Sequence, residues 1–165
     1  MPILETRHLR WPDEAACEHF AAQLAHALTS RPGLLDASIE LHGALGVGKT
    51  SLVRHLLRAL GVTGRVKSPS YAVLESYSLQ EWGGVGEVSH FDFYRFSDPR
   101  EWEDAGFREV FAAPGLKLSE WPEKAAGMLP PADLQIWLSV NDDDSRAVQL
   151  KAGTQTGAAL LEALP

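Results

Sequence analysis

The sequence predicts an α/β fold, in which helices form layers on both sides of a mixed central sheet in a single domain. Three observations support this prediction. Strand-like and helix-like segments alternate along the chain, the two clearest helical stripes each follow a short strand-like run, and two late segments have the pattern of antiparallel strands. The length of 165 residues suits one domain with one hydrophobic core.

The composition is that of a soluble globular protein, with 45% hydrophobic and 22% charged residues. The formal charge of −7 argues against a large basic surface, so we expect no strong direct binding of nucleic acid. Cys17 is the only cysteine, and its place on an apolar helix face predicts a buried structural thiol. No apolar run approaches 18 residues and no signal pattern opens the chain, so we expect a cytoplasmic protein without a membrane role.

The first predicted elements are a strand over residues 3–9 and a helix that follows it. The segment Trp11-Pro12-Asp13-Glu14 is expected to start the helix, because proline suits a first turn and carboxylates suit its positive end. Five residues fall on one helical face: Cys17, Phe20, Ala21, Leu24 and Leu28. The segment 30–33 contains proline and glycine and ends the helix.

A second strand and a second helix surround a glycine-rich segment. Residues 37–41 form a short apolar run that predicts a buried strand, and residues 51–60 predict a helix closed by Gly61. The apolar stripe of this helix comprises Leu52, Val53, Leu56, Leu57 and Leu60.

The middle of the chain predicts a β-hairpin followed by short helices. Residues 71–79 and 88–94 are rich in strand-forming side chains, and the glycine-rich segment 80–87 between them predicts a turn. Asp98-Pro99 is expected to begin a helix that reaches about residue 105, and a shorter helix is expected over residues 107–111.

The last third predicts three strands and a helix. Residues 115–119 form a buried strand, residues 134–140 and 147–151 form an antiparallel pair around the turn 141–144, and residues 157–164 form a helix. Strands 37–41, 88–93 and 116–119 are expected at the centre of the sheet. Because ligands gather at the carboxyl ends of such strands, we expect Thr50, Asp92 and Glu120 at one edge.

The glycine-rich segment has the Walker A pattern of a phosphate-binding loop and predicts a P-loop NTPase-like fold. Glycines bring backbone N–H groups close to phosphate oxygens, and the following helix points its positive end at the same anion. Lys49 adds a charge for the β- and γ-phosphates, and the Thr50 hydroxyl can bind Mg²⁺. The residues expected to contact nucleotide here are Gly43, Ala44, Leu45, Gly46, Val47, Gly48, Lys49, Thr50 and Ser51.

Two carboxylates at strand ends are candidates for catalysis and for metal binding. Asp92 follows an apolar strand, as the metal-holding aspartate of phosphate-loop enzymes does. Glu120 follows another, and it can hold Mg²⁺ or orient the attacking water. Together with Lys49 they form the predicted catalytic set. Trp121 can pack on the nucleotide, on a partner or into the core.

Two further features carry weaker predictions. The hydroxyls of Ser68 and Ser70 can sense a γ-phosphate, although an ordinary turn around Pro69 explains this segment nearly as well. The six histidines show no metal-ligand spacing. Among the histidines, His90 is the best candidate for a functional role, through its neighbour Asp92. A histidine that simply packs in the core is nevertheless the better explanation of its presence.

The nucleotide class follows from which motifs are present. The guanine-binding pattern Asn-Lys-x-Asp is absent, because the only asparagine, Asn141, is followed by Asp142. ATP and ADP are therefore the expected nucleotides. A small-molecule kinase usually carries an arginine-rich lid, and none is visible after Asp92. An ATPase that drives a partner therefore fits better than a kinase, and a nucleotide-gated binding module with negligible turnover is the third alternative.

Four stretches taken together resemble the TsaE family, formerly YjeE, of bacterial tRNA threonylcarbamoyladenosine biosynthesis. They are Leu45-Gly46-Val47-Gly48-Lys49-Thr50, Lys67-Ser68-Pro69-Ser70-Tyr71, His90-Phe91-Asp92-Phe93-Tyr94-Arg95 and Glu120-Trp121-Pro122-Glu123. The resemblance covers roughly residues 11–151. Walker A alone is common to many families, whereas the combination of the four is specific.

The resemblance implies an ATPase that is weak alone and is stimulated by the TsaB–TsaD pair, which modifies the adenosine at position 37 of tRNA. It implies that Lys49 and the loop amides bind phosphate, that Thr50 and Glu120 hold Mg²⁺, and that Asp92 supports the metal or the water. It also implies a switch over residues 68–71, with Trp121 beside the nucleotide and Trp11 and Pro12 near its base. In this family tRNA is reached only through the partners. Ser70 stands where the family often has threonine.

Overall fold

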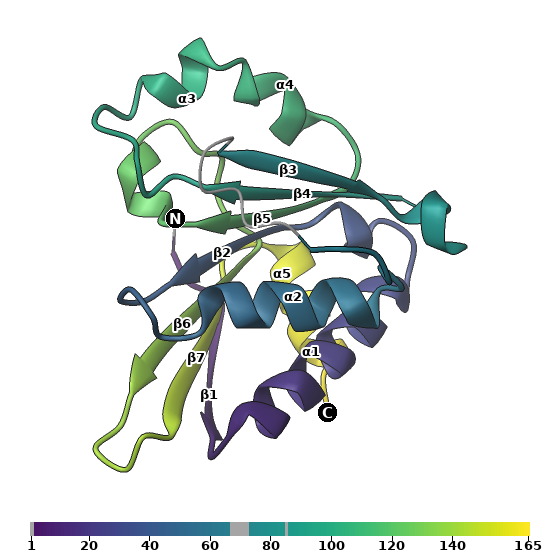
Figure 1. Cartoon of the computed structure of the whole chain (residues 1–165), viewed down its shortest axis with the longest axis vertical. Coiled ribbons are helices and arrows are strands. Elements are labelled where there is room, and N and C mark those ends of the chain that lie inside the picture. Colours follow the sequence, from purple (N-terminus) through teal and green to yellow (C-terminus); the bar gives the residue numbers. More distant parts are fainter. Residues whose placement is uncertain (1, 67–72, 85) are drawn as a thin grey trace.

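A computed structural model describes residues 2–66, 73–84 and 86–165 of the protein. Within these residues seven strands form one mixed sheet in the order β1-β7-β6-β2-β5-β4-β3 (Figure 1). The parallel centre consists of β6 (Leu134–Val140), β2 (Ser38–His42), β5 (Leu116–Glu120) and β4 (Glu87–Asp92). The antiparallel additions are β3 (Leu74–Ser78) on β4, β7 (Arg146–Ala152) on β6, and β1 (Glu5–Trp11) on β7. The predicted mixed sheet is confirmed, and its three expected central strands are neighbours.

Helices cover both faces of this sheet. One face carries α1 (Glu14–Thr29), α2 (Lys49–Ala59) and α5 (Gln155–Ala163), and the other carries the short helices α3 (Glu101–Asp104) and α4 (Phe107–Ala112) beside β3 and β4 (Figure 1). Short 3₁₀ segments cover Leu34–Asp36, Leu79–Trp82 and Pro122–Ala125. The predicted three-layer α/β architecture is therefore confirmed. No helix in the described ranges is long and apolar enough to cross a membrane.

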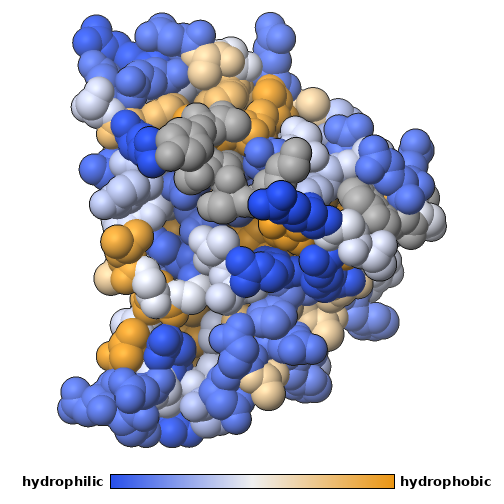
Figure 2. Space-filling view, in the orientation of Figure 1, coloured by the Kyte–Doolittle hydropathy of each residue, from blue (hydrophilic) through white to orange (hydrophobic). Residues whose placement is uncertain are grey.

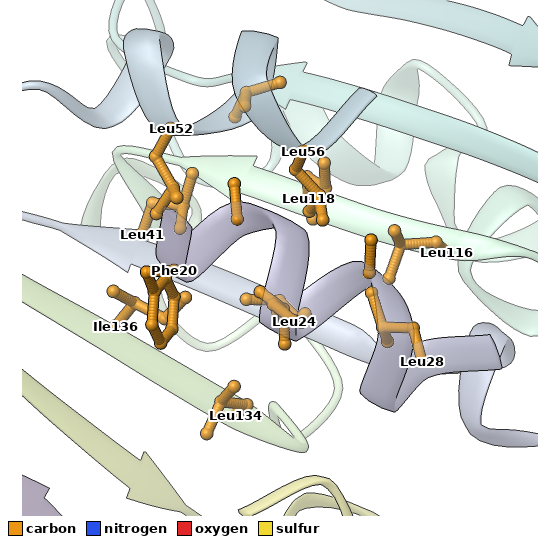
Figure 3. Close-up of a cluster of buried hydrophobic side chains, with 14 of the residues drawn as sticks. Phe20, Leu24, Leu28, Leu41, Leu52, Leu56, Leu116, Leu118, Leu134 and Ile136 are labelled. Carbon is orange, nitrogen blue, oxygen red and sulfur yellow. The ribbon is translucent and has the colours of Figure 1, made fainter. Parts of the chain in front are cut away.

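The main core lies between α1, α2 and the sheet. Phe20, Leu24 and Leu28 of α1 point at the strands, and Leu52 and Leu56 of α2 meet them from the neighbouring helix (Figure 3). The strand side chains that they meet are Leu41, Leu116, Leu118, Leu134 and Ile136. Over these helices the surface is mostly hydrophilic, with hydrophobic side chains in separate patches (Figure 2). The helical stripes read from the sequence thus face the core, as amphipathic helices should.

A second, aromatic cluster fixes the other layer. Phe91 of β4 packs against Phe107 and Phe111 of α4, with ring centroids 5.1 and 4.8 Å away. Phe93 and Trp102 belong to the same cluster, and both are almost fully buried. Since side chains alternate across a strand, burial of Phe91 on this face directs His90 and Asp92 to the opposite face. The layer of α3 and α4 therefore helps to orient the end of β4.

Some predicted boundaries are wrong. Trp11 ends β1 and does not begin a helix, and Asp13 is the N-cap of α1, accepting a hydrogen bond of 3.0 Å from the Ala16 amide. The strand extends to Trp11 because its pairing with β7 continues that far. This end is set by a contact with a distant part of the chain and not by the local sequence. The helix expected from Asp98 begins only at Glu101, whose carboxylate accepts a hydrogen bond from the Ser97 amide.

Cys17 allows a direct test of the packing of α1. Its side chain is buried, and burial, with the nearby Glu14 and Glu18 carboxylates, raises the pKa of the thiol to about 12. Because the thiolate is the reactive form, we expect its reaction with a disulfide reagent at pH 8 to be on the order of 1,000-fold slower in the folded protein than in denaturant. Equal rates in the two states would show that the α1 face is not packed as described.

Candidate functional site

The glycine-rich segment connects β2 to α2 at the carboxyl edge of the parallel strands. Gly43 has a φ of 147°, and a Cβ atom there would lie 2.6 Å from the Leu138 carbonyl oxygen. Gly48, with a φ of 115°, is the N-cap of α2. Any other residue at Gly43 would therefore push the segment away from β6, and at Gly48 it would strain the turn into the helix.

The start of α2 is free of a side-chain cap. Asp13 caps α1 and Thr154 caps α5, each accepting a hydrogen bond from a first-turn amide, whereas Gly48 has no side chain to do so. The first backbone N–H groups of α2 thus lack this partner, and the positive end of the helix dipole points in the same direction. This combination is suited to an anion such as phosphate.

Lys49 lies folded against the loop that precedes it. Its Nζ donates a hydrogen bond of 2.6 Å to the Gly43 carbonyl and sits 3.6 Å from the centre of the Trp121 ring. The side chain is only 4% exposed, and burial lowers the pKa of the ammonium, while the carboxylates of Glu120, Glu123 and Asp92 act in the opposite direction. Because burial outweighs these carboxylates, an anion close by would stabilise the ammonium further.

Glu120 is the central carboxylate of the site. It ends β5 and is 2% exposed, and within the described residues each of its oxygens has one hydrogen-bond partner. The Thr50 hydroxyl donates to Oε1 over 2.9 Å, and Nε2 of His90 lies 2.6 Å from Oε2. The sequence predicted that Thr50 and Glu120 would meet at this edge, and they do. It did not predict the partner on the other oxygen.

Asp92 lies next to Glu120 in the sheet. The two are register partners on β4 and β5, and Asp92 accepts a hydrogen bond of 3.0 Å from the Tyr94 amide. Burial raises the pKa of Asp92, the negative charge of Glu120 adds to this effect, and the Tyr94 hydrogen bond opposes it. Two carboxylates side by side favour a cation between or near them.

These residues fit a magnesium site of the phosphate-loop type. Among the described residues there is no group of three histidine, cysteine, aspartate or glutamate side chains that could hold a metal. Mg²⁺ in nucleotide sites needs only one or two protein ligands, since waters and phosphates supply the others. The Thr50 hydroxyl, which can donate to Glu120 and still offer its lone pairs, and the Glu120 carboxylate meet that requirement.

A cavity of about 250 Å³ adjoins the glycine-rich segment. Its walls include Trp11, Gly46, Ser51 and the acidic residues Asp13, Glu14 and Asp144. Trp11 packs on Phe20 of α1. Pro12 is exposed and is not among the residues that line the cavity. Arg146 also lines the cavity, and its Nε donates a hydrogen bond of 2.9 Å to the Val47 carbonyl. Nothing in the sequence around Arg146 indicated this support of the loop.

Most of the predicted site therefore comes together. The glycine-rich segment, Asp92, Glu120 and Trp121 lie around Lys49, and Trp11 lies at the adjoining cavity. The Trp121 side chain is half-buried, and its backbone adopts a left-handed conformation. The centres of the Trp121 and Tyr94 rings are 4.9 Å apart. Ser68, Pro69, Ser70 and Tyr71 lie outside the described residues, so the predicted switch stays a prediction. His90 contacts Glu120, whereas the sequence suggested a role through its neighbour Asp92.

Comparison with known proteins points in one direction. The sequence profile of the family "Threonylcarbamoyl adenosine biosynthesis protein TsaE" matches residues 11–148. The tRNA threonylcarbamoyladenosine biosynthesis protein TsaE of Haemophilus influenzae is 37% identical over 153 residues, which cover 92% of this chain and 93% of that protein. The protein of the same name from Bacillus subtilis is 32% identical over 146 residues, with coverage of 88% and 87%.

A solved structure agrees with the sequence comparison. The crystal structure of Bacillus subtilis YdiB superposes with a TM-score of 0.77 and 26% sequence identity. The match covers 98% of this chain and 95% of YdiB. The same arrangement of strands and helices thus extends over nearly the whole of both chains.

Proposed function

The chain belongs to the TsaE family of threonylcarbamoyladenosine biosynthesis proteins, and on this premise we propose that it binds ATP with Mg²⁺ and hydrolyses it. The observation that carries the proposal is the contact between Thr50 and Glu120 beside the uncapped start of α2. A phosphate site alone would suit many ligands. A phosphate site with a hydroxyl and a carboxylate in contact suits a phosphate that arrives with a divalent cation.

Each residue of the site has a distinct part in the proposed reaction. The amides at the start of α2 bind the β- and γ-phosphates, and Lys49 leaves the Gly43 carbonyl to reach them. Thr50 and Glu120 would hold Mg²⁺, which when bound neutralises charge that develops on the phosphates. Asp92, beside Glu120, supports that site or orients the attacking water. Lys49, Asp92 and Glu120 are thus the proposed catalytic residues.

The cavity beside the loop offers room for the rest of the nucleotide. A base or ribose attached to a phosphate in the loop would enter between Trp11, Gly46 and Ser51. The Trp11 side of the cavity suits a purine ring, and polar side chains such as Asp13 and Ser51 can hydrogen-bond the base or the ribose hydroxyls. The absence of a guanine-binding motif from the sequence favours adenine. Trp121 would lie on the phosphate side, next to Lys49.

We further propose that hydrolysis serves a protein partner. The family relationship points to the cytoplasmic TsaB–TsaD pair as that partner, with the tRNA contacted by the pair and not by this chain. The formal charge of −7 supports a tRNA contact made by the pair, since a protein that bound tRNA directly would be expected to carry a basic surface. In this proposal ATP hydrolysis drives repeated turnover of the pair.

The test is phosphate release from ATP by the purified protein, with and without TsaB–TsaD. We expect slow release alone, a clear increase with the pair, and a requirement for Mg²⁺. No increase with the pair would contradict the partner assignment. Recovery of the phosphate on a nucleoside or sugar would establish a small-molecule kinase, and tight binding without release would establish a nucleotide-gated binding module.

A further inference from the structure

His90 is a buried titratable side chain that the proposed reaction leaves without a task. It lies on β4, is fully buried, and its Nε2 is 2.6 Å from Oε2 of Glu120. Full burial keeps the imidazole away from solvent and from the cavity beside the loop, so it can act on a nucleotide only through another residue. Glu120 is the residue that it contacts.

The contact has a defined direction. Nδ1 of His90 has no hydrogen-bond partner among the residues that the structure describes. The neutral tautomer with its proton on Nε2 leaves no buried N–H unpaired, so we assign Nε2 as the donor and the carboxylate as the acceptor. Thr50 donates to the other oxygen, Oε1. Two donors, one on each oxygen, restrict rotation of the Glu120 carboxylate.

We propose that His90 is a positioning residue, which fixes the Glu120 carboxylate so that Oε1 faces Thr50 and the cation of the nucleotide complex. This inference rests on the proposed Mg²⁺-dependent nucleotide binding. Hydrogen-bond partners of metal ligands orient those ligands, and their loss typically reduces metal affinity by about 10- to 100-fold. The position of His90 on a strand held by the aromatic cluster under α3 and α4 makes it a rigid donor.

The experiment compares His90→Leu, which removes the donor, with His90→Gln, whose amide N–H can take the place of Nε2. ADP affinity is measured by titration with Mg²⁺ and with EDTA, and the ratio of the two affinities is the readout. We expect His90→Leu to lower the Mg²⁺ enhancement about 10- to 100-fold with affinity in EDTA unchanged. We expect His90→Gln to keep most of the enhancement.

His90→Asn is the second variant, because asparagine is polar but too short to reach Oε2 from the same backbone position. It should behave like His90→Leu, and it keeps the test valid if the leucine variant does not fold in thermal denaturation. An undiminished Mg²⁺ enhancement in the leucine or asparagine variant would overturn the inference, as would equal losses in all three variants. If the unmodified protein shows no Mg²⁺ enhancement, the proposed function itself fails.

Discussion

Replacement of Lys49 with alanine should lower ATP hydrolysis by about 10²- to 10³-fold, the usual effect of removing one preorganised donor from a developing charge. Lys49 follows directly after the glycine-rich segment, and its ammonium is buried between the Gly43 carbonyl and the Trp121 ring. In the described part of the chain no other lysine donates a hydrogen bond to the glycine-rich segment or to Glu120, so no neighbouring ammonium takes over its role. The rate of phosphate release in the presence of TsaB–TsaD measures the effect.

The fold should survive this change. The Lys49 side chain is buried with a lowered pKa, so its removal relieves an unfavourable burial of charge. Lys151→Ala is the matched control, because Lys151 lies on β7 with its Nζ 4.8 Å from the Trp137 ring and should leave hydrolysis unchanged. Normal hydrolysis by a folded Lys49→Ala protein would exclude the glycine-rich segment as the catalytic phosphate site.

Replacement of Glu120 with glutamine should lower Mg²⁺-dependent hydrolysis by about 100-fold or more, since a carboxylate that holds a cation is lost while the side-chain shape is kept. The amide can still accept the Thr50 hydrogen bond through its oxygen. Its NH₂ group then faces the N–H of Nε2 of His90, from which the carboxylate accepted a hydrogen bond. Phosphate release at several Mg²⁺ concentrations measures the effect.

Glu123→Gln is the control for this variant. Glu123 lies three residues along the chain, its side chain is 52% exposed, and its Oε2 lies 3.9 Å from Nδ1 of His42. We expect it to hydrolyse ATP at the normal rate. ADP affinity in EDTA should be normal in both variants, and a loss of that affinity in Glu120→Gln would mean that Glu120 shapes the phosphate site and does not act through the cation.

The sequence predicted the architecture because its signals are local. The stripes of α1 and α2 are repeated every three to four residues, and the antiparallel pair β6 and β7 is joined by a short polar turn. The boundaries at Trp11 and Glu101 could not be predicted in the same way. The first depends on pairing with a strand at the other end of the chain, and the second on a carboxylate that accepts from the Ser97 amide.

The candidate site was predictable to the extent that it consists of strand ends. A motif after β2 and acidic residues at the ends of β4 and β5 must share one edge of a parallel sheet. Side-chain pairing across that edge was not predictable. Asp92 is the register partner of Glu120, yet His90 makes the hydrogen bond, because two carboxylates are both acceptors whereas an imidazole N–H can donate. Arg146 supports the loop from a position 99 residues away, where local patterns carry no information.

The pairing of β1 with β7 affects how the protein is made. Glu5 pairs with Ala152 and Trp11 with Arg146, so β1 finds its neighbour only when the ribosome has passed those residues. Until then β1 is an unpaired strand on a growing polypeptide, a state prone to wrong association. Loop closure over such a separation is slow compared with hairpin formation. We therefore expect the wall of the cavity at Trp11 to be among the last parts of the nascent chain to reach its native form.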